Sequence, residues 1–145
     1  MTTSVEEFGG IDQATWKELS RAAAKARDRA YVPYSKFSVG AALLTTSGDI
    51  VTGCNVENAT IGATVCAERT AIGCAVASGH TEFRALCVVT DIEPPAAPCG
   101  ICRQVLAEFC EDLPILLMTP DGDRRQTTLD ELLPMRFSGR DFNHP

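Results

Sequence analysis

The stretch FRALCVVTDIEPPAAPCGICRQVLAEFCEDLPILLM, residues 83–118, contains the alternation of elements that decides the fold. Residues 83–90 are rich in apolar and β-branched side chains and predict a strand. The proline-rich residues 93–98 predict a loop, and a helix is expected over residues 99–110. Residues 115–118 predict a second, short buried strand. A strand, a helix and a strand in this order are typical of an α/β domain.

Upstream, residues 14–30 predict an amphipathic helix that Pro33 ends. Apolar residues recur there at steps of three and four, which places them along one stripe of a helix. This stripe consists of Trp16, Leu19, Ala23, Ala26 and Ala30.

The remaining elements complete a sheet covered on both faces. Residues 38–44 and 49–54 flank a turn-rich tetrad and predict a β-hairpin. Residues 66–78 are apolar nearly all round, which suits a helix buried against a sheet. Residues 124–127 predict a strand and residues 129–133 a helical turn. We therefore predict an α/β fold, a three-layer α/β/α sandwich with a central mixed five-stranded sheet.

Length and composition indicate one ordinary globular domain. The chain has 145 residues, of which 45% are hydrophobic and 22% charged. We expect a single domain over residues 1–145, in which residues 1–12 form a poorly ordered arm. The formal net charge of −6 repels polyanions, so a nucleic-acid polymer is not expected as a partner.

The seven cysteines point to metal binding or catalysis. Residues 1–10 lack the apolar run of a secretory signal, and no segment has the apolar length of a membrane helix. We therefore expect a cytoplasmic protein without a membrane partner. Clustered cysteines in a reducing compartment favour a metal site over disulfides.

The residue pattern that carries chemistry is Cys66-Ala67-Glu68 followed by Cys99 and Cys102. Cys99 and Cys102 stand one helical turn apart at a predicted helix start, and Cys66 opens the other helix. Helix N-termini lower thiol pKa values, and three thiolates leave a catalytic zinc one open position for water. Glu68 is close enough to accept a proton from that water, which makes it the candidate proton carrier.

Two other interpretations of these cysteines stay open. The Cys-x-x-Cys pair could be a redox dithiol, although that motif usually follows a strand directly and here follows a proline-rich loop. A structural zinc site would need a fourth ligand from among Cys54, Cys74, Cys87 and Cys110. Those four cysteines are otherwise expected to be small core residues.

Four blocks of sequence, in the right order, resemble the cytidine deaminases. They are residues 32–43, residues 53–59, the two cysteine motifs at 66–71 and 98–106, and residues 132–137. The all-cysteine version is similar to the small free-nucleoside enzymes that form homotetramers. The resemblance implies a zinc-dependent hydrolysis of cytidine and deoxycytidine to uridine and deoxyuridine, with release of ammonia, in pyrimidine salvage.

The resemblance also assigns a role to each matching position. Cys66, Cys99 and Cys102 match the zinc ligands and Glu68 the proton shuttle. The positions on the substrate side are Asn55 and Glu57 for the ribose 3′-hydroxyl, Phe37 for packing on the pyrimidine, Ala67 for a backbone contact to the base, and Phe137 for a neighbouring subunit's pocket. Arg69 matches an arginine that hydrogen-bonds the thiolates.

Residue chemistry offers plainer interpretations of some of these positions. Asn55 and Glu57 could simply cap a loop, and Phe37 and Phe137 could simply pack in the core. A carboxylate at Glu57 would repel a phosphate, which favours a nucleoside over a nucleotide.

The chain departs from the family pattern at two positions. Ile61 replaces a common Tyr, and Gly73 stands in mid-helix. The alternatives in function are a deaminase of another aminopyrimidine nucleoside and a structural zinc-binding module. A nucleic-acid editor is disfavoured by the acidic balance and by the lack of a basic aromatic groove.

Overall fold

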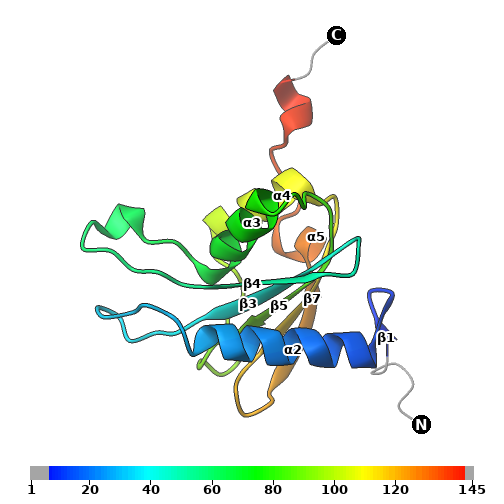
Figure 1. The fold of residues 1–145 in the computed structure, drawn as a ribbon. Coiled ribbons are helices and arrows are strands. Elements are labelled where there is room, and N and C mark those ends of the chain that lie inside the picture. Colours follow the sequence, from blue (N-terminus) through cyan, green and yellow to red (C-terminus); the bar gives the residue numbers. More distant parts are fainter. Residues whose placement is uncertain (1–6, 143–145) are drawn as a thin grey trace.

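The computed structural model describes residues 7–142 and centres on a five-stranded sheet with the order β4-β3-β5-β6-β7 (Figure 1). The strands β5 and β6 are parallel, and the other neighbouring pairs are antiparallel. The sheet is therefore mixed, as predicted. Its members are β3 (Gly40–Thr45), β4 (Ile50–Cys54), β5 (Phe83–Val89), β6 (Pro114–Met118) and β7 (Arg124–Thr128).

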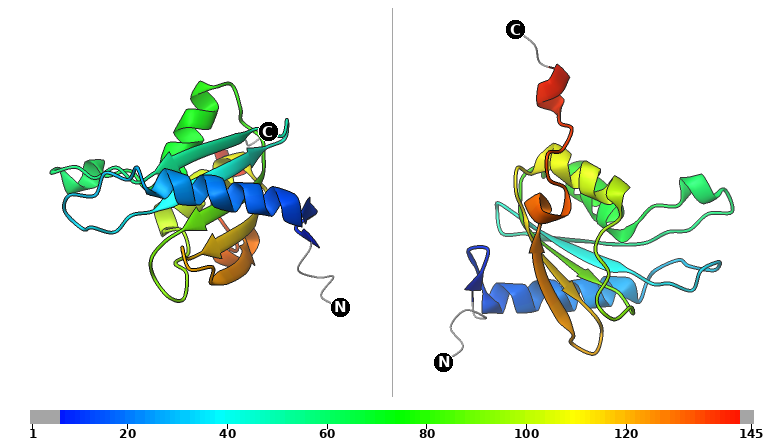
Figure 2. Two further views of the ribbon diagram at one scale, coloured as in Figure 1. Left: turned by 60° about the horizontal axis from the view of Figure 1, so that its bottom comes forward. Right: turned by 180° about the vertical axis from the view of Figure 1, so that it is seen from behind.

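Helices cover both faces of this sheet, which confirms the three-layer prediction (Figures 1 and 2). Helix α2 (Gln13–Arg27) lies on one face, and α3 (Ala67–Ala77), α4 (Gly100–Phe109) and α5 (Leu129–Leu132) lie on the other. A hydrophobic core lies on each face of the sheet, and alternate residues of β3 point into the two cores. Ala41 packs beneath α3, whereas Ala42 packs against α2.

Helix α2 is shorter than its apolar stripe predicts. Asp12 caps its start, because its carboxylate accepts a hydrogen bond from the Thr15 amide at 2.8 Å. The helix ends at Arg27 rather than at Ala30. The amides of Arg29 and Ala30 bond three residues back, to Ala26 and Arg27, so the last turn tightens.

Two glycines let the helices approach the sheet closely. A Cβ atom on Gly40 would lie 2.0 Å from the Ala23 carbonyl oxygen of α2. A Cβ atom on Gly53 would lie 2.4 Å from the Ala71 nitrogen and 2.5 Å from the Ala67 oxygen, both in α3. The contact atoms belong to helix backbones, so neither position has room for a side chain.

The expectation of a poorly ordered arm is wrong for residues 7–12; residues 1–6 lie outside the described part. Strands β1 (Glu7–Phe8) and β2 (Ile11–Asp12) form a hairpin. The Phe8 ring stacks on Trp16 with ring centroids 5.3 Å apart, and Trp16 Nε1 donates to the Phe8 carbonyl at 3.0 Å. This aromatic contact supplies the buried area that orders the segment.

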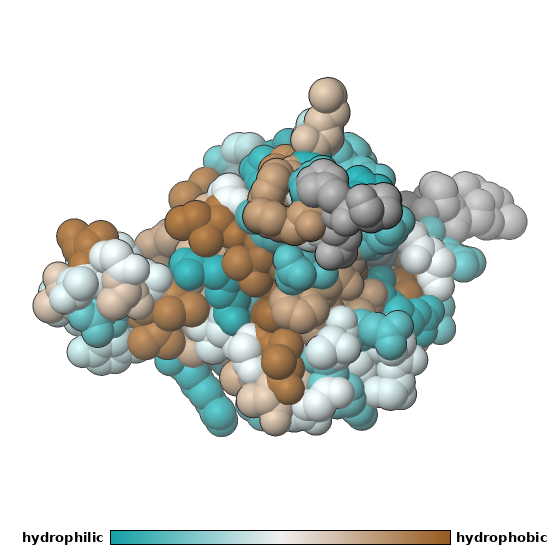
Figure 3. Space-filling view, turned by 90° about the horizontal axis from the view of Figure 1, so that it is seen from above, coloured by the Kyte–Doolittle hydropathy of each residue, from teal (hydrophilic) through white to brown (hydrophobic). Residues whose placement is uncertain are grey.

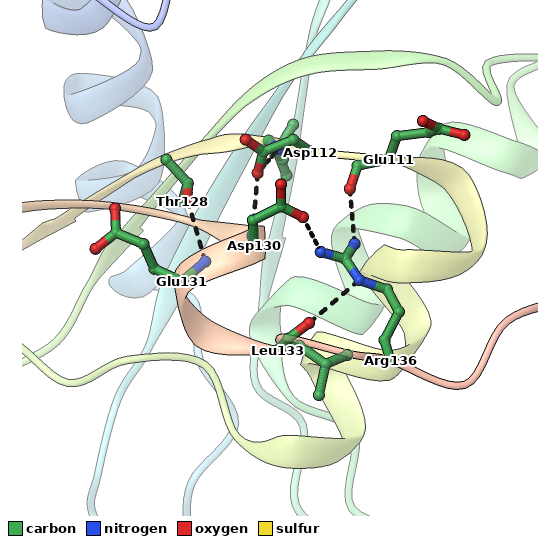
Figure 4. A network of polar contacts seen from close by, with 8 residues as sticks. Glu111, Asp112, Thr128, Asp130, Glu131, Leu133 and Arg136 are labelled. Carbon is green, nitrogen blue, oxygen red and sulfur yellow. Dashed lines mark hydrogen bonds and ion pairs between the residues drawn. The ribbon is translucent and has the colours of Figure 1, made fainter.

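Arg136 fastens the C-terminal segment to the body (Figure 4). Its guanidinium donates to the carbonyl oxygens of Glu111 at 2.7 Å and Leu133 at 3.2 Å, and it pairs with Asp130. Beyond it, the short 3-10 helix η2 (Gly139–Phe142) projects away from the sheet (Figures 1 and 2).

A second projection stands at one end of the sheet. The loop that holds the 3-10 helix η1 (Ile61–Ala63) lies beside the loop after α2, and a bridge between Tyr31 and Val56 joins their bases. No helix within residues 7–142 is both long and apolar enough to cross a membrane.

Candidate active site

The sulfur atoms of Cys66, Cys99 and Cys102 lie within 4.8 Å of one another. Cys66 is the N-cap residue of α3, and Cys99 is the N-cap residue of α4. Both caps have extended backbone, and Cys99 Sγ accepts a hydrogen bond from the Cys102 amide at 3.5 Å. Two helix N-termini therefore converge on the cluster, and their dipoles favour negative charge on the sulfurs.

The three sulfurs fit a zinc ion. Zinc bound tetrahedrally to sulfur, with bonds of about 2.3 Å, holds two sulfurs roughly 3.8 Å apart. The distance between Cys66 Sγ and Cys99 Sγ is 3.8 Å. Within residues 7–142, no other group of histidine, cysteine and acidic side chains has comparable ligand spacing. No further cysteine joins the cluster, so the geometry favours a three-ligand site over a four-cysteine structural site.

Hydrogen bonds concentrate negative charge on Cys66. A bond from the Cys102 thiol, assisted by Arg69, lowers the pKa of Cys66 to about 5. The same bond raises the pKa of Cys102, which keeps its proton. Arg69 Nη2 lies 3.5 Å from Cys66 Sγ and 3.4 Å from the Thr64 carbonyl oxygen. One thiol is thus ionised near neutral pH, and an arginine lies against it.

Glu68 occupies the first turn of α3, and its side chain is only 4% exposed. Burial raises the pKa of its carboxyl group to about 7, and the charge of Cys66 adds to this effect. A carboxyl group with such a pKa can both accept and release a proton near neutral pH. Glu68 and the sulfurs therefore combine a metal site with a proton carrier.

Asn55 and Glu57 hold the loop that contains Phe37. Asn55 is buried, and its side chain accepts from the Val39 amide at 2.9 Å and donates to the Phe37 carbonyl at 2.7 Å. Glu57 accepts hydrogen bonds from the segment just before Phe37. Both residues thus brace this loop, as the loop-capping interpretation predicts.

The other predicted substrate positions differ in their surroundings. The Phe37 ring is half-buried and packs against the core. Ala67 is fully buried at the start of α3. Phe137 is 58% exposed on the projecting segment, where its ring contacts Phe142. The core-packing interpretation is therefore wrong for the Phe137 ring, although its carbonyl still accepts a hydrogen bond from Gln104 of α4 at 3.0 Å.

Sequence reasoning missed Ser35. Its hydroxyl lies between the Glu57 carboxylate and the Phe37 amide. Ser35 falls in a block that resembles the deaminases, but no spacing rule links it to a carboxylate 22 residues away.

Residues 14–117 match the family model of the cytidine and deoxycytidylate deaminase zinc-binding region. The chain belongs to this deaminase family. A cytidine deaminase of Sporosarcina psychrophila is 54% identical over 121 residues, which are 83% of this chain and 89% of that protein. A cytidine deaminase of Halalkalibacterium halodurans is 48% identical over 126 residues, which are 86% of this chain and 96% of that protein.

A solved structure agrees with this membership. The crystal structure of cytidine deaminase from Burkholderia pseudomallei matches with a TM-score of 0.81 and 48% identity, over 83% of this chain and 98% of that one. The family is zinc-binding, and the three-cysteine cluster has the ligand spacing for such an ion, which favours a metal centre over a redox dithiol.

Proposed function

We propose that this deaminase removes the exocyclic amine of cytidine and deoxycytidine, giving uridine or deoxyuridine and ammonia, in pyrimidine salvage. The observation that carries the proposal is a buried carboxyl group, that of Glu68, beside three thiols that lie close together. The thiols and the carboxyl group come from the first turns of α3 and α4. Hydrolysis of an amidine carbon needs an activated water and a group that moves protons between two sites on the base.

Each residue of this cluster has a defined task in the proposal. Cys66, Cys99 and Cys102 would hold zinc, which supplies a Lewis acid that makes water nucleophilic near neutral pH. The Glu68 carboxylate accepts a proton from the attacking water and delivers it to N3 of the cytosine ring, so C4 becomes electrophilic. Glu68 then takes the proton of the new hydroxyl group on C4 and passes it to the amino nitrogen, so the C4–N bond breaks, the C4 carbonyl forms and ammonia leaves. Arg69 offsets part of the thiolate charge through its bond to Cys66.

The residues on the substrate side favour a free nucleoside. In the proposal, Phe37 packs on the pyrimidine ring, the Ala67 backbone contacts the base, and Asn55 and Glu57 meet the sugar. The Glu57 pKa is lowered, chiefly by the Ser35 hydroxyl, so Glu57 carries a negative charge at neutral pH. A negative charge at the sugar repels a 3′-phosphate, which disfavours 3′-nucleotides and polynucleotides.

We further propose that the protein acts as a homotetramer of single-domain subunits. Large apolar side chains lie exposed on the side of α3, α4 and the projecting C-terminal segment (Figure 3). They are Val76, Ile101, Met135, Phe137 and Phe142. Exposed apolar groups gathered on one side favour burial against another subunit, and Phe137 would then reach a neighbouring pocket.

The seven free cysteines support a cytoplasmic location. Cys74, which was expected in the core, is an exposed thiol outside the metal cluster, and such a thiol persists in a reducing compartment.

The test is the loss of cytidine absorbance in the ultraviolet, with and without a strong zinc chelator. Deoxycytidine, cytosine and CMP are assayed in parallel, which separates a nucleoside deaminase from one for a base or a nucleotide. We expect turnover of the two nucleosides only, with loss of activity in chelator and recovery on addition of zinc. Stoichiometric zinc without deamination of any substrate would instead favour a structural zinc module.

A further inference from the structure

The Glu57 carboxylate has most of its acceptor capacity occupied within the chain. Its Oε1 accepts hydrogen bonds from the amides of Tyr34 at 3.0 Å and Ser35 at 3.1 Å. Its Oε2 accepts one bond from the Ser35 hydroxyl. An ionised carboxylate has about four lone-pair directions, so one direction remains, and it is on Oε2.

Ser35 connects this carboxylate to the loop around Phe37. Its hydroxyl hydrogen is used on Glu57, and its oxygen accepts the Phe37 amide at 3.0 Å. Asn55 holds the carbonyl of Phe37 from the other side. The Ser35 hydroxyl therefore links the Phe37 amide to Glu57 Oε2, while the amides of Tyr34 and Ser35 hold Oε1.

We infer that Ser35 is a positioning residue for sugar recognition: it turns Glu57 so that the last free acceptor direction of Oε2 faces a sugar hydroxyl of the nucleoside. This inference rests on the proposed function. A carboxylate free to rotate would offer any of its lone pairs to solvent, and the sugar would have to order it on binding. Two backbone amides hold Oε1, and the Ser35 hydroxyl fixes Oε2, so the carboxylate is ordered before the sugar binds.

The chemistry of the bonds defines the ligand group. The ionised Glu57 carboxylate can only accept hydrogen bonds, and the Ser35 hydroxyl already donates its hydrogen to Glu57. The ligand must therefore supply the donor, and a sugar hydroxyl has one. A nucleoside without that hydroxyl cannot form the hydrogen bond to Glu57. The loss of affinity caused by removing the Ser35 hydroxyl must therefore differ between substrates with and without the sugar hydroxyl.

The experiment compares Ser35→Ala with the wild type on cytidine and on 3′-deoxycytidine. We expect the KM for cytidine to rise about tenfold in Ser35→Ala, the size that a hydrogen bond to a charged group implies. The KM for 3′-deoxycytidine should rise less than that for cytidine, because this substrate shares the contact with Phe37 but lacks the hydroxyl that Glu57 would accept. The kcat for cytidine should stay within about twofold, because the metal cluster lies on α3 and α4.

Two further variants separate positioning from simple folding effects. Ser35→Thr keeps the hydroxyl, and the exposed position has room for its methyl group, so it should restore the KM for cytidine. Ser47→Ala is the matched control, since the Ser47 hydroxyl also donates to a carboxylate in a turn, that of Asp49 at 3.2 Å. Ser47→Ala should leave the ratio of the two KM values unchanged.

The outcomes are distinct. An equal rise in KM for both substrates, or no rise, in an enzyme that deaminates cytidine would overturn the role of Ser35 alone. Failure of Ser35→Thr to restore the KM for cytidine would do the same. A wild-type protein that turns over neither nucleoside would overturn the proposed function and this inference together.

Discussion

The contact between Gly53 and helix α3 leads to a prediction about both stability and zinc affinity. In Gly53→Ala, the new Cβ atom would lie 2.4 Å from the Ala71 nitrogen, whereas ordinary contact begins at 3.4 Å. The difference, 3.4 − 2.4 = 1.0 Å, is the distance by which α3 must move away from the sheet. Overpacking of this kind costs about 1–3 kcal/mol of unfolding free energy.

The same movement disturbs the metal centre. Cys66 and Glu68 are carried by α3, whereas Cys99 and Cys102 belong to α4. Metal–ligand distances tolerate only about 0.2 Å of change, so a shift of one helix near 1 Å strains the three-sulfur geometry. We expect zinc affinity to fall at least about tenfold, the range seen when the support of a metal ligand is lost.

Two other glycines provide matched controls. Gly40→Ala brings a Cβ atom even closer to α2, at 2.0 Å, on the opposite face of the sheet, so it should lower stability without weakening zinc binding. In Gly73→Ala, the new Cβ atom has no neighbour within 4 Å, and alanine favours a helix more than glycine does. This variant should therefore raise the free energy of unfolding by up to about 1 kcal/mol.

The assay combines zinc titration against a competing chelator with thermal unfolding of the zinc-free and zinc-loaded proteins. Wild-type zinc affinity in Gly53→Ala would refute the reasoning. Equal losses of zinc affinity in Gly53→Ala and Gly40→Ala would also refute it, because the effect would then not pass through α3.

Three other predictions follow from individual side chains. Glu68→Gln should retain stoichiometric zinc and lose turnover by at least about 100-fold, measured by metal analysis and ultraviolet assay; activity near the wild-type level would exclude Glu68 as the proton carrier. In zinc-free protein, burial raises the pKa of Glu68 to about 7, so its contribution to stability is lost as the pH rises from about 4.5 to 7. Denaturant titrations should show up to about 3 kcal/mol less stability from this group at pH 8 than at pH 4, a slope that Glu68→Gln removes; an unchanged slope in the variant would contradict the assignment. Arg136→Met should cost about 1–3 kcal/mol by leaving the carbonyls of Glu111 and Leu133 without their donor, and a Tm equal to that of the wild type would count against this anchoring.

Much of the sheet and the metal centre could be predicted because their signals are local. Periodicity located α2, and the strands β3 to β7 begin and end within two residues of their predicted bounds. The cysteine spacing predicted the three-sulfur cluster, because one helical turn separates Cys99 from Cys102 and a helix start holds Cys66. Patterns of this kind depend only on helix and strand geometry.

Other features escaped prediction for physical reasons that differ. The N-terminal hairpin turns at Gly9 and Gly10, whose φ angles of 63° and 74° are those of a tight hairpin turn, so a signal was present in the sequence. The bond between Ser35 and Glu57 had no such signal, because it joins two loops that only the folded sheet brings together. The exposure of the Phe137 ring depends on how the C-terminal segment runs along α4, which periodicity does not encode.

The capping of α4 by Cys99 has a consequence for how the protein acquires its metal. The sulfur accepts the Cys102 amide, a bond that contributes to holding the first turn of α4 and the rotamer of Cys99 without help from the ion. Little ordering then remains for the ion to impose, and most of the free energy of coordination goes into affinity. We therefore expect the zinc-free protein to keep its fold and to rebind zinc after chelation without unfolding.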